Sequence, residues 1–239
     1  MANQYFKFKQ FTIIQEKSAM KVGTDGVLLG AWTNCYDKQQ ILDIGTGTGL
    51  ITLMLAQRTD DNARIDTVEI DEEAYLEGVL NVNNSIWKDK ISLYHISFQE
   101  YMKKANKIYD LIVSNPPFFS NSKKANNSSR SLARHNDSLP IDTLFKGVKN
   151  LLSDNGIFSI IIPFDNHDKI LSEGIKNNLF CIRKMWVKPT PNISPKRVML
   201  EFAKKDNKCI KDTIILEANG RHQYSKDYIN LTKEFYLSL

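Results

Sequence analysis

Short apolar runs alternate with longer segments in which apolar residues recur every three or four positions along most of the chain. The runs are typical of buried strands and the longer segments of helices, so their alternation predicts a mostly parallel sheet with helices on both faces. Strands are expected at 40–44, 65–69, 91–96, 109–114, 156–162, 180–188 and 196–204. Helices are expected at 48–58, 72–85, 98–104, 139–152 and 166–177. Because only a loop separates the last two strands, they can pair as a hairpin, which reverses one of them.

Both ends of the chain lie outside this alternation. Residues 1–37 begin with alternating aromatic and polar positions, which predict a strand or hairpin, and a helix is expected to follow from about Gly26 with Thr24 or Asp25 as its cap. Residues 206–239 predict a strand near 213–218 and a helix near 225–237. We expect one domain over residues 1–239, with both ends packed on it.

Composition narrows the class of protein only a little. The 239 residues are 42% hydrophobic and 25% charged, enough for an ordinary globular core, and no apolar run approaches membrane-spanning length. The first residues lack the apolar core of a signal peptide, so a cytoplasmic protein is expected. Cys35, Cys181 and Cys209 form no metal-binding or disulfide pattern and fit a reducing compartment. The formal net charge of +5 permits a polyanionic partner without requiring one.

A glycine-rich turn, Asp43–Gly49, follows the first strand of the alternation and precedes a helix. In this context glycines allow a backbone to approach a nucleotide-like ligand closely. The next strand ends at Glu69, whose carboxylate can accept both hydroxyl groups of a ribose. The alternative is an ordinary strand-to-helix turn, and the second motif described next makes the ligand-binding interpretation much stronger.

That motif is Asn115-Pro116-Pro117-Phe118, directly after the strand 109–114. Neither proline can donate a backbone hydrogen bond, so the strand ends here in a stiff turn. Asn115 and the main-chain carbonyl beside it offer two acceptors, and Phe118 offers a flat apolar face. This combination suits a planar amino group such as the exocyclic amine of a flipped base. Taken alone, the four residues could be only a proline-rich turn.

With Asp43 in front, the G-x-G-x-G spacing resembles motif I of the class I S-adenosylmethionine-dependent methyltransferases, and the Asn-Pro-Pro-Phe turn resembles motif IV of those that methylate amino nitrogens. The resemblance implies a Rossmann-like, seven-stranded, mostly parallel sheet with one antiparallel strand. It implies S-adenosylmethionine as the cofactor, held by Asp43, Gly45, Thr46, Gly47, Gly49 and Glu69. This family often has an acidic residue after the third strand that contacts the cofactor's adenine; here Ser97 stands in its place, and Ser97 and Phe98 are predicted to make that contact.

Further segments resemble the tRNA1(Val) adenine-37-N6 methyltransferases almost from end to end. They are Phe6–Phe11, Met20–Trp32, Ala133-Arg134-His135 and Pro195-Lys196-Arg197. That family implies methylation of the adenine next to the anticodon of a valine tRNA, without a metal ion. In related enzymes an element before motif I closes over the methionine end of the cofactor. Whether Thr24 or Asp25 does so, or the helix simply packs on the sheet edge, stays open.

Basic residues suggest where RNA would bind. The polar segment after the Asn-Pro-Pro-Phe turn carries Lys123, Lys124, Arg130 and Arg134, and Lys196 and Arg197 open the last strand. Each set could contact phosphate or simply face solvent. Three alternatives to the tRNA enzyme remain: a release-factor glutamine methyltransferase, another RNA or DNA amino-methyltransferase, and an RNA-binding module without activity. The oligomeric state is left open.

Overall fold

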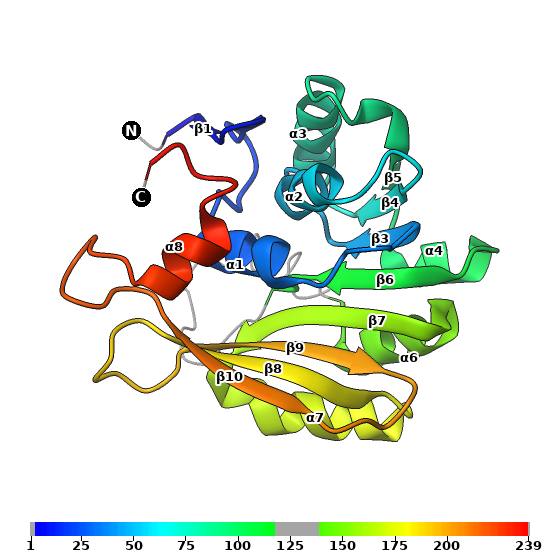
Figure 1. Ribbon diagram of the computed structural model, residues 1–239. Helices are drawn as coiled ribbons and strands as arrows, with labels where there is room; N and C mark the ends of the chain where they lie inside the picture. Colours follow the sequence, from blue (N-terminus) through cyan, green and yellow to red (C-terminus); the bar gives the residue numbers. More distant parts are fainter. Residues whose placement is uncertain (1–2, 118–138, 239) are drawn as a thin grey trace, which may run out of the picture.

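The computed structural model of the protein describes residues 3–117 and 139–238. Their main feature is a twisted eight-stranded sheet in the order β10-β8-β9-β7-β6-β3-β4-β5 (Figure 1). The strands are β3 (Gln40–Ile44), β4 (Arg64–Glu69), β5 (Ile91–His95), β6 (Tyr109–Ser114), β7 (Leu152–Pro163), β8 (Phe180–Lys188), β9 (Arg197–Ala203) and β10 (Ile210–Ile215). Only β9 runs against its neighbours, whereas all other pairings are parallel. The predicted α/β class with one reversed strand is confirmed.

The predicted number of seven strands is wrong by one. The tail strand, expected near 213–218, lies at Ile210–Ile215 and pairs in parallel with Arg183–Lys188 of β8. The sequence did not predict this pairing, because most positions of the tail strand are exposed and its residues do not indicate which strand it pairs with. The added strand covers the backbone groups along the outer edge of β8, which would otherwise stay unpaired.

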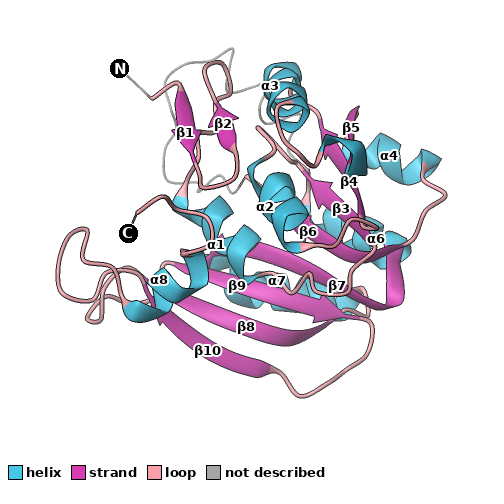
Figure 2. Cartoon of the chain, turned by 45° about the horizontal axis from the view of Figure 1, so that its top comes forward, coloured by secondary structure: helices cyan, strands magenta, loops and turns pink. Residues whose placement is uncertain are grey.

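Helices cover both faces of the sheet (Figure 2). One face packs against α1 (Thr24–Trp32), α2 (Leu50–Arg58), α3 (Glu72–Asn83) and α8 (Lys226–Thr232). The other packs against α4 (Phe98–Lys104), α6 (Ile141–Leu151) and α7 (His167–Lys176). Two short 3-10 turns, η1 (Lys88–Lys90) and η2 (Phe164–Asn166), connect elements. Successive residues of the central strands enter opposite cores: Leu111 and Val113 of β6 face the first group of helices, and Ile112 faces the second.

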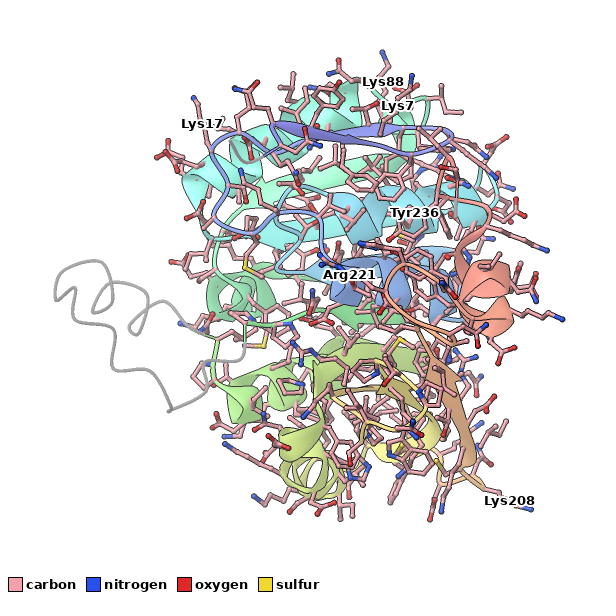
Figure 3. All side chains as sticks on the ribbon, turned by 90° about the vertical axis from the view of Figure 1, so that its left-hand side faces the viewer. Lys7, Lys17, Lys88, Lys208, Arg221 and Tyr236 are labelled. Atoms are coloured by element: carbon pink, nitrogen blue, oxygen red, sulfur yellow. The ribbon has the colours of Figure 1, made fainter. Side chains whose placement is uncertain are left out.

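The two chain ends pack together at one side of the molecule (Figure 3). The N-terminal hairpin, β1 (Tyr5–Lys7) and β2 (Thr12–Ile14), is the predicted one. The ring of Tyr236 lies 5.8 Å from that of Phe8, and the Lys9 amide donates to the Phe235 carbonyl at 2.8 Å. The tail helix ends at Thr232, earlier than predicted, because the chain then turns to reach this hairpin.

Two buried side chains of α3 tie the N-terminal segment to the rest of the molecule. Asn81 Oδ1 accepts from the Ile14 amide at 2.8 Å, and the Glu77 carboxylate accepts from the Lys17 and Ser18 amides at 2.6 and 2.9 Å. A buried carboxylate that receives two backbone hydrogen bonds is well satisfied. The segment before β3 is therefore held in place by polar contacts as well as by its aromatic residues.

The structure also bears on two expectations from composition, which concern membrane-spanning segments and the three cysteines. No helix among the described residues is long and apolar enough to span a bilayer. The three cysteines are free thiols, but folding brings Cys181 and Cys209, distant in sequence, to an Sγ–Sγ distance of 3.7 Å. Burial, with the neighbouring Cys209 thiol adding to it, raises the pKa of Cys181 to about 12.

Candidate active site

The glycine turn, Asp43–Gly49, connects β3 to α2 at the carboxyl edge of the sheet. Gly45, Gly47 and Gly49 have φ angles of +73°, +57° and +84°, in the left-handed region that strongly favours glycine. A Cβ atom added to Gly45 or Gly47 would meet no atom of the described chain within 4 Å. The glycines are therefore required by backbone conformation, and the turn borders open space into which a ligand can come close to the main chain.

Asp43 lies beneath this turn and is fully buried. Its Oδ2 accepts hydrogen bonds from the hydroxyl groups of Thr46 at 2.9 Å and Thr52 at 2.6 Å. Its Oδ1 has no hydrogen-bond partner in residues 3–117 and 139–238. Burial raises the pKa of Asp43 to about 6, although the two threonine hydrogen bonds act in the opposite direction. Asp43 thus holds the turn in place through its hydrogen bonds to the two threonines, and its Oδ1 stays free to accept a further hydrogen bond.

Glu69 joins the end of β4 to the glycine turn. Its Oε2 accepts from the Gly47 amide at 2.8 Å, and its Oε1 accepts from the Ile70 and Asp71 amides at 2.8 and 2.9 Å. Because a carboxylate offers about four acceptor positions, these three bonds leave room for a ribose hydroxyl. Glu69 therefore lies against the predicted cofactor turn, because β4, which it ends, is the direct neighbour of β3 in the sheet.

The Asn-Pro-Pro turn, Asn115–Pro117, meets the glycine turn from the neighbouring strand. Ser114 at the end of β6 is paired with Ile44 at the end of β3, and the Ser114 hydroxyl donates to the Ile44 carbonyl at 2.9 Å. Asn115 consequently follows its strand at the same level at which Gly45 follows its own. Asn115 is half-buried, Pro116 is buried and Pro117 is exposed, while Phe118 lies outside the described residues. Two motifs distant in sequence therefore form one edge site.

Ser97 and Phe98 lie after β5 on the same edge, but their side chains have structural partners. The Ser97 hydroxyl caps α4 by accepting from the Glu100 amide at 3.2 Å. Phe98 is buried in the core between α4 and α6, so tightly that a Cβ added to Gly147 would lie 2.5 Å from its ring. Contact of either residue with the cofactor's adenine stays a prediction.

The prediction that Thr24 or Asp25 caps the preceding helix is wrong. The helix begins at Thr24, its N-cap is Gly23, and no side chain caps it. Asp25 instead accepts from the Arg197 Nε at 2.7 Å, which ties the start of α1 to the start of β9. Arg197 therefore already has a carboxylate partner, whereas Lys196 is exposed. The other basic candidates, Lys123, Lys124, Arg130 and Arg134, lie outside the described residues.

Sequence reasoning did not find one group of residues on this edge. Phe164, His167, Trp186 and Lys188 line a cavity beyond the end of β7. No motif marks them, because they come from separate elements, and their apolar members read as ordinary strand and helix residues.

The fold and this edge site define a class I methyltransferase. The family model of the methyltransferase small domain matches residues 18–169, and the chain belongs to that family. The solved structure of a predicted O-methyltransferase from Agrobacterium tumefaciens superposes with a TM-score of 0.68 at 14% identity, covering 88% of this chain and 96% of the other. A ribosomal protein L11 methylase from Lactobacillus delbrueckii gives 0.53 at 17% identity, over 76% and 78% of the two chains. At such low identity these two show the fold alone.

Curated relatives are much closer in sequence. A protein of Flavobacterium psychrophilum is 47% identical over 98% of this chain and its own full length. A protein of Bacteroides thetaiotaomicron is 46% identical over the full length of both chains. Both are named tRNA1(Val) (adenine(37)-N6)-methyltransferase. The predicted family is confirmed, and S-adenosylmethionine is the methyl donor that it implies.

The residues present fit this cofactor. The open space beside Gly45 and Gly47, the free acceptor of Asp43 and the remaining acceptor capacity of Glu69 lie together at the ends of the neighbouring strands β3 and β4. Bound S-adenosylmethionine supplies a methyl group on a positively charged sulfur. Two carboxylates at this turn favour a cationic ligand electrostatically.

Proposed function

We propose that this methyltransferase methylates N6 of adenine 37 in the anticodon loop of tRNA1(Val). The observation that carries the proposal is the pairing of Ser114 with Ile44, which sets the Asn-Pro-Pro turn beside the glycine turn. An amine held at the first turn then faces a methyl donor held at the second. The names of the full-length relatives supply the choice of tRNA and of nucleotide.

In this proposal Asn115 and Pro116 act on the amine. Its nitrogen is a poor nucleophile because the lone pair is delocalised into the ring. When Asn115 Oδ1 and the Pro116 carbonyl accept its two N–H groups, the nitrogen becomes more pyramidal and its lone pair turns toward the methyl group. Fixed orientation and hydrogen-bond acceptors that are already in place lower the barrier. The methylated nitrogen is acidic and releases its proton to water, so no strong base is needed.

Phe118 and the basic segment complete the proposed substrate site, although both lie outside the described residues. Phe118 would stack on the flipped adenine, a contact worth about 1–3 kcal/mol. Lys123, Lys124 and Arg130 would bind phosphate groups near the turn. We infer a cytoplasmic location from the proposed tRNA substrate.

The test uses purified protein, labelled cofactor and three substrates: valine tRNA, the same tRNA with guanine in place of adenine 37, and a peptide-release factor. Label on the first tRNA alone, recovered as N6-methyladenosine in a nucleoside digest, is the expected result. Label on both tRNAs would move the target to another nucleotide. Label on a glutamine of the release factor, with none on RNA, would overturn the proposal in favour of protein methylation.

The role of the basic segment is tested separately. Neutralising Lys123, Lys124 and Arg130 together should weaken tRNA binding and lower its salt dependence, by roughly 0.7–0.9 in the log–log slope for each lost phosphate contact. Cofactor affinity should not change. An unchanged salt slope would show that these residues face solvent.

A further inference from the structure

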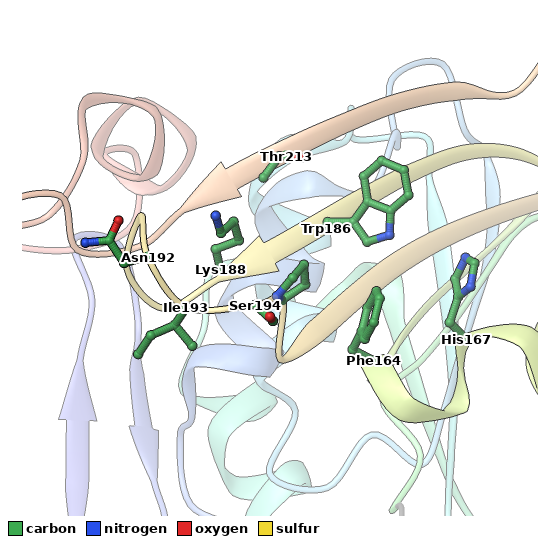
Figure 4. Close-up of a pocket in the computed structure, with 9 residues that line it drawn as sticks. Phe164, His167, Trp186, Lys188, Asn192, Ile193, Ser194 and Thr213 are labelled. Carbon is green, nitrogen blue, oxygen red and sulfur yellow. The ribbon is translucent and has the colours of Figure 1, made fainter.

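A cavity of about 530 Å³ lies beyond the ends of β7, β8 and β10, and no residue of the glycine turn or of the Asn-Pro-Pro turn lines it (Figure 4). We call it the aromatic cavity. Its lining residues are Phe164, His167, Trp186, Lys188, Asn192, Ile193, Ser194, Pro195 and Thr213. The cavity is largely open to solvent, so a flat group can enter it from the molecular surface.

The aromatic cavity lies on the same edge of the sheet as the proposed active site. β7, β8 and β10 all run parallel to β6, so their carboxyl ends meet at one edge. Ser114 of β6 is level with Ile160 of β7, and Trp186 is level with Ile162 through Val198 of β9. Trp186 is therefore level with the Asn-Pro-Pro turn and three strands away, roughly 14 Å along the edge. A polynucleotide with one base at Asn115 can reach this position with a neighbouring nucleotide.

Three aromatic rings gather on one side of the cavity (Figure 4). Phe164 and His167 are stacked, with ring centroids 6.0 Å apart and planes 13° from parallel. The Lys184 ammonium lies 3.3 Å from His167 Nε2, and His167 Nδ1 lies 2.8 Å from Asp168 Oδ1. The same ammonium lies 5.8 Å from the centroid of Trp186. The buried Lys184 thus holds both rings in place, which lowers the entropy lost when a flat ligand stacks on them.

The other side of the cavity combines polar groups with the apolar Ile193 and Pro195, and no carboxylate belongs to the lining residues. Lys188 ends β8 and donates to the Pro191 carbonyl, which places its ammonium in the wall formed by the loop. Asn192, Ser194 and Thr213 add an amide and two hydroxyl groups. Stacking rings that face a cation and neutral polar groups match a nucleotide, because its base has a π face and its phosphate is negative.

We propose that the aromatic cavity is a subsite for a splayed nucleotide of single-stranded RNA that flanks the methylated one. Its base stacks on Trp186, and its phosphate contacts Lys188. The subsite extends the proposed tRNA function, on which the identity of its natural ligand rests. The evidence for the subsite itself is the geometry of the cavity. An experiment can therefore reject the subsite without rejecting the proposed tRNA function, and the reverse.

The first test measures tryptophan fluorescence while a short single-stranded oligoadenylate is added. Stacking on Trp186 quenches its emission, whereas Trp32 and Trp87 belong to the core on the other face. Trp186→Phe should bind the oligonucleotide as the wild type does, by anisotropy of a labelled strand, but should lose the quenching. Trp186→Ala should lose roughly five- to hundredfold in affinity. Undiminished quenching in Trp186→Phe, or unchanged affinity in Trp186→Ala, would overturn the proposal.

The second test follows turnover with valine tRNA. Trp186→Ala should raise KM for tRNA by a similar factor and leave both kcat at saturating tRNA and cofactor affinity unchanged. Tyr36→Ala is the matched control, because Tyr36 is an exposed aromatic residue that precedes β3 at the opposite edge. Equal KM values in the two variants would count against the subsite. Where Trp186→Ala melts earlier than wild type, the Trp186→Phe quenching result decides.

The two tests separate the subsite from the proposed function. Methylation of tRNA with a KM that does not depend on Trp186 would keep the function and overturn the subsite. Trp186-dependent binding of the oligonucleotide, without methylation of any tRNA, would support the subsite and overturn the function.

Discussion

The glycine turn and the aromatic cavity lie on one edge of the same sheet but are built in different ways. The glycine turn is seven consecutive residues with left-handed glycines and a buried carboxylate beneath them. The aromatic cavity combines side chains from η2, α7, β8, β10 and the loop after β8. A turn that must hold a fixed cofactor is encoded locally. The aromatic cavity, which we propose as an RNA subsite, depends instead on elements that are distant in sequence.

The largest expected effect is on the rate of methyl transfer and follows from a substitution in the Asn-Pro-Pro turn. Asn115→Ala removes one of the two acceptors that we propose for the reacting amine and should lower the single-turnover rate by about 10²–10³. Cofactor affinity, and oligonucleotide quenching at Trp186, should stay as in the wild type. Single-turnover measurement with valine tRNA checks the rate, and a nearly unchanged value would remove Asn115 from the catalytic role.

The buried carboxylate of Asp43 gives the glycine turn a pH-dependent contribution to stability. The folded pKa of Asp43, about 6, lies above its ordinary value of 3.8, so the folded state binds more protons between these values. This contribution to stability is full below the lower pKa and is lost as pH rises to about 6. The unfolding free energy of wild type minus that of Asp43→Asn should therefore fall by about 2–3 kcal/mol from pH 4 to pH 7.

Urea titrations of both proteins at several pH values measure this difference. The subtraction removes the contribution of every group that does not interact with Asp43. Parallel curves for wild type and Asp43→Asn would mean that the carboxyl group keeps its ordinary pKa in the fold.

A third substitution changes the glycine turn without touching the cavity. Gly47→Val introduces a β-branched residue at a φ of +57° and fills the open space beside the turn. We expect a loss of S-adenosylmethionine affinity of roughly five- to hundredfold, because the side chain occupies the cofactor's space and strain of this kind costs about 1–3 kcal/mol. Glu69→Gln keeps the shape but lacks the charge and should weaken binding less. Calorimetry measures both, and wild-type affinity in both variants would reject the cofactor assignment of this turn.

The smallest expected effect concerns Arg197, which lies between the two regions. Its ion pair with Asp25 is partly exposed on both sides, so Arg197→Gln should cost less than about 1 kcal/mol of stability. If Arg197 serves mainly to hold α1, KM for tRNA will not change, whereas Lys196→Gln will lower the salt dependence of binding. A raised KM in Arg197→Gln alone would instead assign it to phosphate.

Local patterns were sufficient to predict much of the fold. The strands and helices from β3 to β9 lie within a few residues of their predicted ranges, because each carries its own apolar period. Three details depended on partners distant in sequence. The tail strand adds to β8, the tail helix ends early to meet the N-terminal hairpin, and Asp25 turns to Arg197 instead of capping its helix. No local pattern records such partners.

The sequence by itself determined the parts of the candidate site that depend on backbone chemistry. Gly45, Gly47 and Gly49 are needed wherever φ is positive, and two prolines end a strand in any fold, so both turns could be recognised as motifs. Only the tertiary structure decided that Glu69 bonds the Gly47 amide, that Asn115 follows β6 beside the glycine turn, and that Trp186, Phe164 and His167 share a cavity. The physical reason is the distance along the chain over which each property is determined. Backbone conformation is set by a residue and its neighbours in sequence, whereas the proximity of side chains follows from strand order and register.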